Sequence, residues 1–268
     1  MIDTHCHLTF PEFRGKSGAI LDEAAEHGVR GAITVATTIA DAERALELAR
    51  ADPRIWSTAG VHPLYSDRPD AEIRDWERLR RCGLDPRCVA WGELGLDRHY
   101  ATPTQDEQRS VLDAQLAAIV RWNAEGLAKP VVIHCREAFD ELLPVLAASG
   151  LPRERFVFHC FTGGPREARL VLDFGAWISF TGVVTFRNAL DVAEAATLVP
   201  EDRLMAETDS PFLTPEPHRT VRPNRPRFLA DVVRRLAELR GVDAAELGRR
   251  LDANAERFFG IRLPGGSP

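Results

Sequence analysis

Eight short apolar segments, each followed by an amphipathic stretch, are the feature that most constrains the fold of this 268-residue chain. Read as strands, they span residues 1–7, 31–37, 55–62, 89–97, 130–136, 155–161, 176–182 and 204–210. The stretches between them, such as GAILDEAAEHG and EQRSVLDAQLAAIVRW, place apolar residues at intervals of three and four, which is typical of helices. This number of β/α units in a chain of this length predicts an α/β fold of the (β/α)₈ TIM-barrel type.

The main alternative is a doubly wound open sheet, which has fewer strands and often a glycine-rich turn after the first one. No G-x-G-x-x-G follows the first strand here. We therefore expect a single barrel domain over residues 1–268, with segment 211–226 as a loop after the last strand. Gly28, Gly150 and Gly175 follow helical stretches and are expected to end them.

Charge and cysteine content restrict the class of protein further. The net charge of −6 gives no overall basic field, so a nucleic acid would have to be held by a local patch. No stretch approaches the roughly 20 apolar residues of a membrane span, and a signal-peptide pattern is not seen. Five cysteines without CxxC spacing suit a reducing compartment. We expect a cytoplasmic enzyme or binding protein that does not contact membranes.

Ionisable residues gather near the carboxyl ends of the predicted strands. His5 and His7 are separated by one residue in the first strand, so both side chains point to the same face. Later strands end with further candidates: His62, Glu93, His134, His159, Glu207 and Asp209. Barrel enzymes build their active sites at this end of the strands, from several strands at once.

Each of these residues alone has an ordinary structural explanation. A single histidine at a strand end is more often a hydrogen-bonded core residue, and Asp209 could cap a turn. Together, however, five histidines and three carboxylates in one small cavity would leave many polar groups without partners. A divalent cation removes that cost by accepting their lone pairs. The sequence thus predicts that His5 and His7 grip a metal ion.

Seven motifs strengthen this interpretation through a resemblance to a known family. The motifs are IDTHCHL, AGVHP, GELGLD, KPVVIHCREA, FHCFTGG, ETDSPFLTP and NAERFFG. In this order they resemble the TatD family of metal-dependent deoxyribonucleases, which lies in the amidohydrolase-like superfamily of (β/α)₈ barrels. The match is collinear from residue 2 to about residue 260.

The resemblance implies two divalent metal ions. His5, His7 and Asp209 would hold the first, His134 and His159 the second, and Glu93 would bridge them. A bridging anion suits two dications about 3.5–4 Å apart. Magnesium, manganese and zinc all remain candidates, because imidazole ligands favour transition metals whereas phosphodiester chemistry often uses magnesium.

The activity that the resemblance implies is hydrolysis of DNA phosphodiester bonds, from the 3′ end of single strands. As a hypothesis, Asp209 also takes the proton from the attacking water. Glu207 would orient a ligand or the base, or serve a purely structural role. His62, which has no place in the metal set, would protonate the leaving oxygen or hold a phosphate.

Phosphate contacts are expected from loops at the same end of the barrel: Arg136, Thr162 and Gly163, and the loop arginines Arg219, Arg222 and Arg225. This chain departs from the family in two places that bear on substrate contacts. It has HRTVRPNRP where relatives show roughly H-R-G-K-x-N-x-P, and it has Arg98 after GLD where an aromatic residue is usual. Neither departure touches the predicted metal ligands.

Two other functions remain open at this point. The same metals could serve an amide, lactone or ester hydrolase, including a deacylase of misacylated tRNA. A metal-stabilised binding protein without catalysis is the other alternative. Assays on single-stranded DNA, esters and aminoacyl-tRNA would separate these possibilities.

Overall fold

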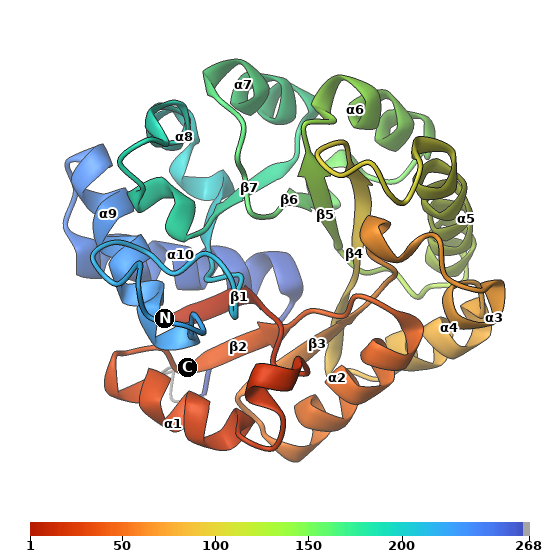
Figure 1. The fold of residues 1–268 in the computed structure, drawn as a ribbon, viewed down its shortest axis with the longest axis horizontal. Coiled ribbons are helices and arrows are strands. Elements are labelled where there is room, and N and C mark those ends of the chain that lie inside the picture. Colours follow the sequence, from red (N-terminus) through yellow and green to blue (C-terminus); the bar gives the residue numbers. More distant parts are fainter. Residues whose placement is uncertain (265–268) are drawn as a thin grey trace.

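Strands and helices alternate along the chain as the sequence predicts, and the helices surround a ring of strands (Figure 1). The computed structural model describes residues 1–264. The strands are β1 (Ile2–Cys6), β2 (Gly31–Thr34), β3 (Ile55–Ala59), β4 (Cys88–Asp97), β5 (Val131–Arg136), β6 (Phe156–Phe158), β7 (Trp177–Phe180) and β8 (Leu204–Ala206). All neighbouring pairs from β1 to β8 are parallel. A further bridge between Cys6 and Ser210 joins the two ends of the sheet, which completes the predicted (β/α)₈ barrel.

The helices connect successive strands on the outside of this ring. They are α1 (Ser17–Glu26), α2 (Ile39–Ala51), α3 (Asp70–Ile73), α4 (Trp76–Leu84), α5 (Gln105–Ala124), α6 (Phe139–Ala148), α7 (Pro165–Phe174), α8 (Leu190–Leu198), α9 (Leu229–Arg240) and α10 (Ala244–Phe259). Segment 211–226 forms the predicted loop between β8 and α9. No helix within residues 1–264 is both long and apolar enough to cross a membrane.

Local sequence signals explain where several helices begin and end. Thr104 and Glu107 form a reciprocal capping box that starts α5. Gly175 adopts a φ of +101° at the end of α7, a conformation that costs glycine little. Gly28 and Gly150 also have positive φ just after α1 and α6, so the three predicted helix ends are confirmed.

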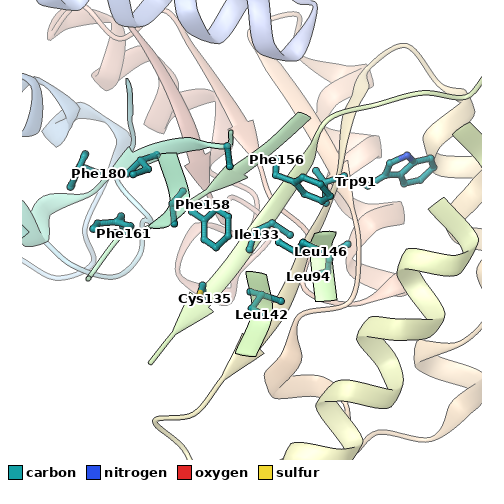
Figure 2. Close-up of a cluster of buried hydrophobic side chains, with 14 of the residues drawn as sticks. Trp91, Leu94, Ile133, Cys135, Leu142, Leu146, Phe156, Phe158, Phe161 and Phe180 are labelled. Atoms are coloured by element: carbon teal, nitrogen blue, oxygen red, sulfur yellow. The ribbon is translucent and has the colours of Figure 1, made fainter. Parts of the chain in front are cut away.

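The outward faces of the strands pack against the helices in the main hydrophobic core. Figure 2 shows part of this core, where Ile133 and Cys135 of β5 lie near Leu142 and Leu146 of α6. Because side chains alternate along a strand, the neighbouring residues Val132 and His134 point to the barrel interior. The period of two thus separates a core face from an interior face.

The barrel interior is apolar at one end and polar at the other. Each strand contributes apolar residues to one cluster, which the end of α10 and the following segment close through Phe259, Ile261 and Leu263. Ionisable residues follow these apolar residues toward the carboxyl ends of the strands, as His134 follows Val132 and His159 follows Val157. This arrangement places the polar groups at the end of the barrel where a site is expected.

Several strands are shorter than predicted. His7, His62, His159, Glu207 and Asp209 lie just after strands, because the chain turns into loops at these points. The largest difference concerns the last strand, which ends at Ala206. Glu207 and Asp209, which the sequence predicts within the last strand, therefore lie beyond it and reach the interior from a loop.

Candidate metal centre

Glu93 is the residue on which most of the predicted ligands converge. Its Oε1 lies 2.6 Å from Nε2 of His159, 2.8 Å from Nδ1 of His134 and 3.2 Å from Nε2 of His62. Its Oε2 lies 3.4 Å from Nε2 of His5. These side chains come from four different strands or strand ends, which the barrel brings to one point. Glu93 has the central position that the resemblance implies for a bridging ligand.

Gly95 explains why the GELGLD motif carries glycine between its two carboxylates. The backbone of β4 passes so close to β5 that a Cβ on Gly95 would lie 1.9 Å from the carbonyl oxygen of His134. Its φ of +151° is also rarely adopted by other residues. The close approach lets Glu93 and Asp97 of β4 both contact His134 of β5.

Asp209 reaches the opposite side of the histidine cluster. Its Oδ1 lies 3.3 Å from Nε2 of His7 and 3.7 Å from Nε2 of His5. The backbone N–H of Asp209 donates to the carbonyl oxygen of His5 at 2.9 Å, which ties the loop after β8 to β1. Asp209 has a φ of +53°, so the loop conformation, and not a strand, directs this carboxylate inward.

Both central carboxylates are ionised in this environment. Burial raises the pKa of Glu93, but the imidazoles of His159, His62 and His134 outweigh it, and the pKa lies well below its usual range. Burial likewise raises the pKa of Asp209, and contacts with His7 and His5 bring it below its usual value. Two carboxylates held in the charged form among imidazoles are the donor set that a divalent metal requires.

Three of the histidines are oriented by oxygen atoms behind them. In each ring one nitrogen faces an oxygen that accepts a hydrogen bond, which leaves the other nitrogen, the one that faces the cluster, available to a metal ion. The contacts are His7 Nδ1 to Val35 O at 2.9 Å, His134 Nε2 to Asp97 Oδ2 at 2.9 Å, and His159 Nδ1 to Glu207 Oε1 at 3.2 Å. Such partners fix the tautomer of metal-binding histidines.

His5 supplies the observation that tests the fit of a metal. Both of its ring nitrogens are buried and make no hydrogen bond within residues 1–264, although Nε2 faces Glu93. Leaving a buried nitrogen without a partner costs free energy, which a metal ligand bond would remove. Donor atoms within 4.8 Å of one another also form three groups: His5, His159, Asp209; His5, His7, Glu93; and His62, Glu93, His134. The residues fit divalent metal ions.

His62 differs from the other histidines in its hydrogen bonding. Its Nδ1 accepts from the backbone N–H of Leu64 at 3.0 Å, so the proton of the neutral ring is on Nε2. Nε2 in turn faces Glu93 and Nδ1 of His134, each at 3.2 Å. Burial lowers the pKa of His62, which favours this neutral form. The ring thus presents a donor to the cluster, where each of the other oriented rings presents a nitrogen that could bind a metal ion.

Glu207 is buried behind His159 and does not line the cleft. Its Oε1 also accepts from the backbone N–H of Cys160 at 2.6 Å, and its Oε2 accepts from Ser179 Oγ at 2.6 Å. Among its alternative roles, the structure places it where it orients His159, with no path to a substrate.

Two carboxylates in the quoted motifs have roles that sequence reasoning missed. Asp97 orients His134, and its spacing of four from Glu93 in the same strand was the available signal. Asp3 accepts from the backbone N–H and the hydroxyl of Thr208, which fastens β1 to the segment after β8. Burial raises the pKa of Asp3 to about 7. Asp3 therefore supports the loop that carries Asp209.

A cleft of about 1200 Å³ opens above the ligand cluster. His7, His62, Glu93, His134, His159 and Asp209 line it, as do three predicted substrate contacts: Arg136, Thr162 and Gly163. His5 lies below them, fully buried.

The predicted loop arginines do not reach this cleft. Arg219 stacks on Phe186 with its guanidinium 3.6 Å from the ring centroid, and Arg222 donates to the hydroxyl of Thr214 at 2.8 Å. Arg225 pairs with a glutamate of α1. Arg219, Arg222 and Arg225 are absent from the cleft lining within residues 1–264, because contacts with Phe186, inside the loop and with α1 turn them away.

Comparison with known proteins was made for sequence and for structure. Residues 2–260 match the family described as TatD related DNase. The chain is 38% identical over 269 residues to the Erwinia tasmaniensis protein named 3'-5' ssDNA/RNA exonuclease TatD, covering 97% of this chain and 100% of that protein. It is 36% identical over 264 residues to the Escherichia coli K12 protein named uncharacterized metal-dependent hydrolase YcfH, covering 97% and 96%.

The crystal structure of YJJV, a TatD homologue from Escherichia coli K12, superimposes with a TM-score of 0.88 and 32% sequence identity over 98% of each chain. A match of this extent leaves no part of the barrel outside the similarity. The chain therefore belongs to the TatD-related DNase family.

Proposed function

We propose that this protein is a metal-dependent hydrolase that cleaves phosphodiester bonds of single-stranded DNA from the 3′ end. The proposal is carried by the convergence of His5, Glu93, His134, His159 and Asp209 at one point below an open cleft. The names of full-length relatives support the choice of substrate, since several are called 3'-5' ssDNA/RNA exonucleases.

Two divalent ions would occupy the cluster. One ion would be held by His5, His7 and Asp209, and the other by His134 and His159. Glu93 would be a ligand of both ions. Such ions supply Lewis acidity and lower the pKa of a water toward neutrality. Zinc, manganese and magnesium all remain candidates, and the four imidazoles favour a transition metal.

The protein's own groups would then divide the remaining work. Asp209 lines the cleft in its ionised form and accepts the proton of the attacking water. His62, with its proton on Nε2, donates to a phosphate or leaving oxygen. Glu207 and Asp97 keep His159 and His134 in position. Arg136, together with Thr162 and Gly163 of the same cleft, contacts the substrate phosphate. We place the protein in the cytoplasm, since all five of its cysteines are free.

The test measures metal-dependent shortening of a 5′-labelled single strand, one nucleotide at a time from its 3′ end. The purified protein is compared with its Glu93→Ala variant. We expect the variant to lose both bound metal, measured by elemental analysis, and activity. A variant that keeps full activity without Glu93 would contradict the proposal.

One observation favours a second candidate, a hydrolase of small, uncharged esters or amides. The cleft lining contains seven carboxylates and two arginines within the described residues, which is unusual for a site that binds a polyanion. Small ester and amide substrates, tested beside DNA, distinguish the two functions. Turnover of these substrates but not of DNA would select the second.

A further inference from the structure

The charge of the cleft limits how many phosphates it can contact. Only Arg136 and Arg166 among residues 1–264 bring positive side chains to its lining. Arg166 is already paired with Asp140 at 2.6 Å and with Glu167 at 2.8 Å. The guanidinium of Arg136 makes neither a hydrogen bond nor an ion pair within the described residues and contacts only the Tyr100 ring there, so it is the one cleft arginine free to bind a phosphate. A strand held mainly through its backbone would need more such contacts.

Aromatic side chains supply a different kind of contact. Residues 1–264 expose six large apolar side chains by more than a third of their surface: Leu84, Tyr100, Val120, Leu190, Leu198 and Phe212. Only Tyr100 and Phe212, 51% and 49% exposed, are aromatic, and only these two line the cleft. Exposed rings at a nucleic-acid site act as platforms on which bases stack.

The two rings lie on opposite sides of the ligand cluster. Phe212 follows β8, and its ring centroid is 6.2 Å from that of His7 and 5.9 Å from that of Phe10. Tyr100 follows β4, and its ring is 4.9 Å from His99, with the guanidinium of Arg136 5.3 Å away. In a closed ring of eight strands, the β8–β1 seam stands opposite β4 and β5 (Figure 1). Both rings are thus held in place, with the proposed metal centre between them.

We propose that Phe212 and Tyr100 each stack a base of the substrate on either side of the scissile phosphate, so that the cleft binds a strand through its bases more than through its phosphates. This inference rests on the proposed function, and it names the residues that would make the protein prefer single-stranded DNA. In a duplex the bases already stack on one another and cannot reach the rings, whereas an unpaired strand offers both faces of each base.

The first test compares two substrates with equal numbers of phosphates: a single-stranded oligothymidylate, and the same strand with abasic residues beside the scissile bond. Phe212→Ala and Tyr100→Ala should each lower kcat/KM for the normal strand by about 5- to 150-fold, mainly through KM, since a stacked base is worth about 1–3 kcal/mol. On the abasic strand the variants should match the wild type. Tyr100→Phe, which keeps the ring, and Leu190→Ala, outside the cleft, should behave as wild type on both strands. Equal losses on the two substrates, or no loss on either, would overturn the inference.

The second test measures binding of the same labelled strand by fluorescence anisotropy over a series of salt concentrations. With one phosphate at the free arginine and one at the metal centre, log Kd should change with log salt with a slope of only about 1.4, because each contacted phosphate of a single strand contributes about 0.7. A slope above about 3 would mean that backbone contacts dominate and would contradict the inference.

The two proposals fail in different ways. If the metal-loaded protein releases no nucleotide, the proposed function fails, and fluorescence anisotropy of the two alanine variants with the normal and the abasic strand still decides whether the rings stack bases. If nucleotide release is normal but insensitive to both alanine variants, the stacking inference fails and the proposed function stands.

Discussion

Hydrogen bonds behind the histidines divide these residues into two chemical groups. His7, His134 and His159 each donate backward to an oxygen and turn the other ring nitrogen toward the cluster, where it could bind a metal ion. His62 accepts from the backbone behind it and turns a proton inward. The same side chain, placed a few ångströms away in the same cavity, is thereby suited to metal binding in three cases and to proton donation in the fourth.

This division predicts the phenotype of His62→Gln. Glutamine keeps an N–H donor but cannot transfer a proton, so turnover should fall by about 10²–10⁴-fold, the range of general acid–base catalysis. Metal content, measured by elemental analysis of the dialysed protein, should stay at the wild-type value. Loss of an ion in this variant would instead make His62 a ligand.

A second residue-scale prediction concerns Asp97, which orients His134. In Asp97→Asn the acceptor remains but its charge is gone, so affinity for the ion at His134 should weaken by about 10- to 100-fold. Calorimetric titration of the metal-free protein measures this change. Asp140→Asn, which alters a cleft carboxylate that pairs with Arg166, is the matched control. Equal metal affinity of the two variants would refute the role of Asp97.

At the scale of elements, regular strands explain which residues sequence reasoning placed well. In VVIHCR of β5, alternation predicts an inward His134 and outward neighbours, and Cys135 indeed packs in the outer core. Alternation along a strand does not explain how Asp209 reaches the cluster, because Asp209 lies in a loop and has a positive φ. Arg219 and Arg222 were misplaced because loop direction depends on contacts with Phe186 and Thr214, which have no period in the sequence.

The close contact between β4 and β5 makes Gly95 the sharpest test of this part of the fold. Gly95→Ala would place a methyl group 1.9 Å from the carbonyl oxygen of His134, and should cost more than about 3 kcal/mol of unfolding free energy. Gly126→Ala, where φ is +89° but no atom lies within 4 Å, should cost only about 1–2 kcal/mol. Urea unfolding of both variants gives the comparison. Similar losses would show that φ alone, and not the packing of the strands, requires glycine at position 95.

The apolar cluster of the barrel interior and the candidate metal centre lie at opposite ends of the barrel. Apolar residues from all eight strands fill the end closed by Phe259, Ile261 and Leu263, and they supply the stability of the fold. The opposite end collects Glu93, Asp97, Glu207 and Asp209 with five histidines, in a protein whose net charge is already −6. Without metal ions, the buried ring nitrogens of His5 have no hydrogen-bond partner within residues 1–264, and only histidines offset the charge of the buried carboxylates, so this end contributes less to stability.

Removal of metal should therefore lower the stability of the entire barrel. An ion present at 100 times its Kd adds about 2.7 kcal/mol to the folded state. For a chain near this size, each kcal/mol changes Tm by about 2–4 °C, so chelation should lower Tm by about 5–11 °C. Calorimetric scans of the metal-loaded protein with and without chelator measure the shift. Glu93→Ala should unfold at the same temperature in both conditions, because its metal centre is lost. If the wild-type protein contains metal but its Tm does not change on chelation, the hydrogen bonds of the polar end alone are sufficient to stabilise it.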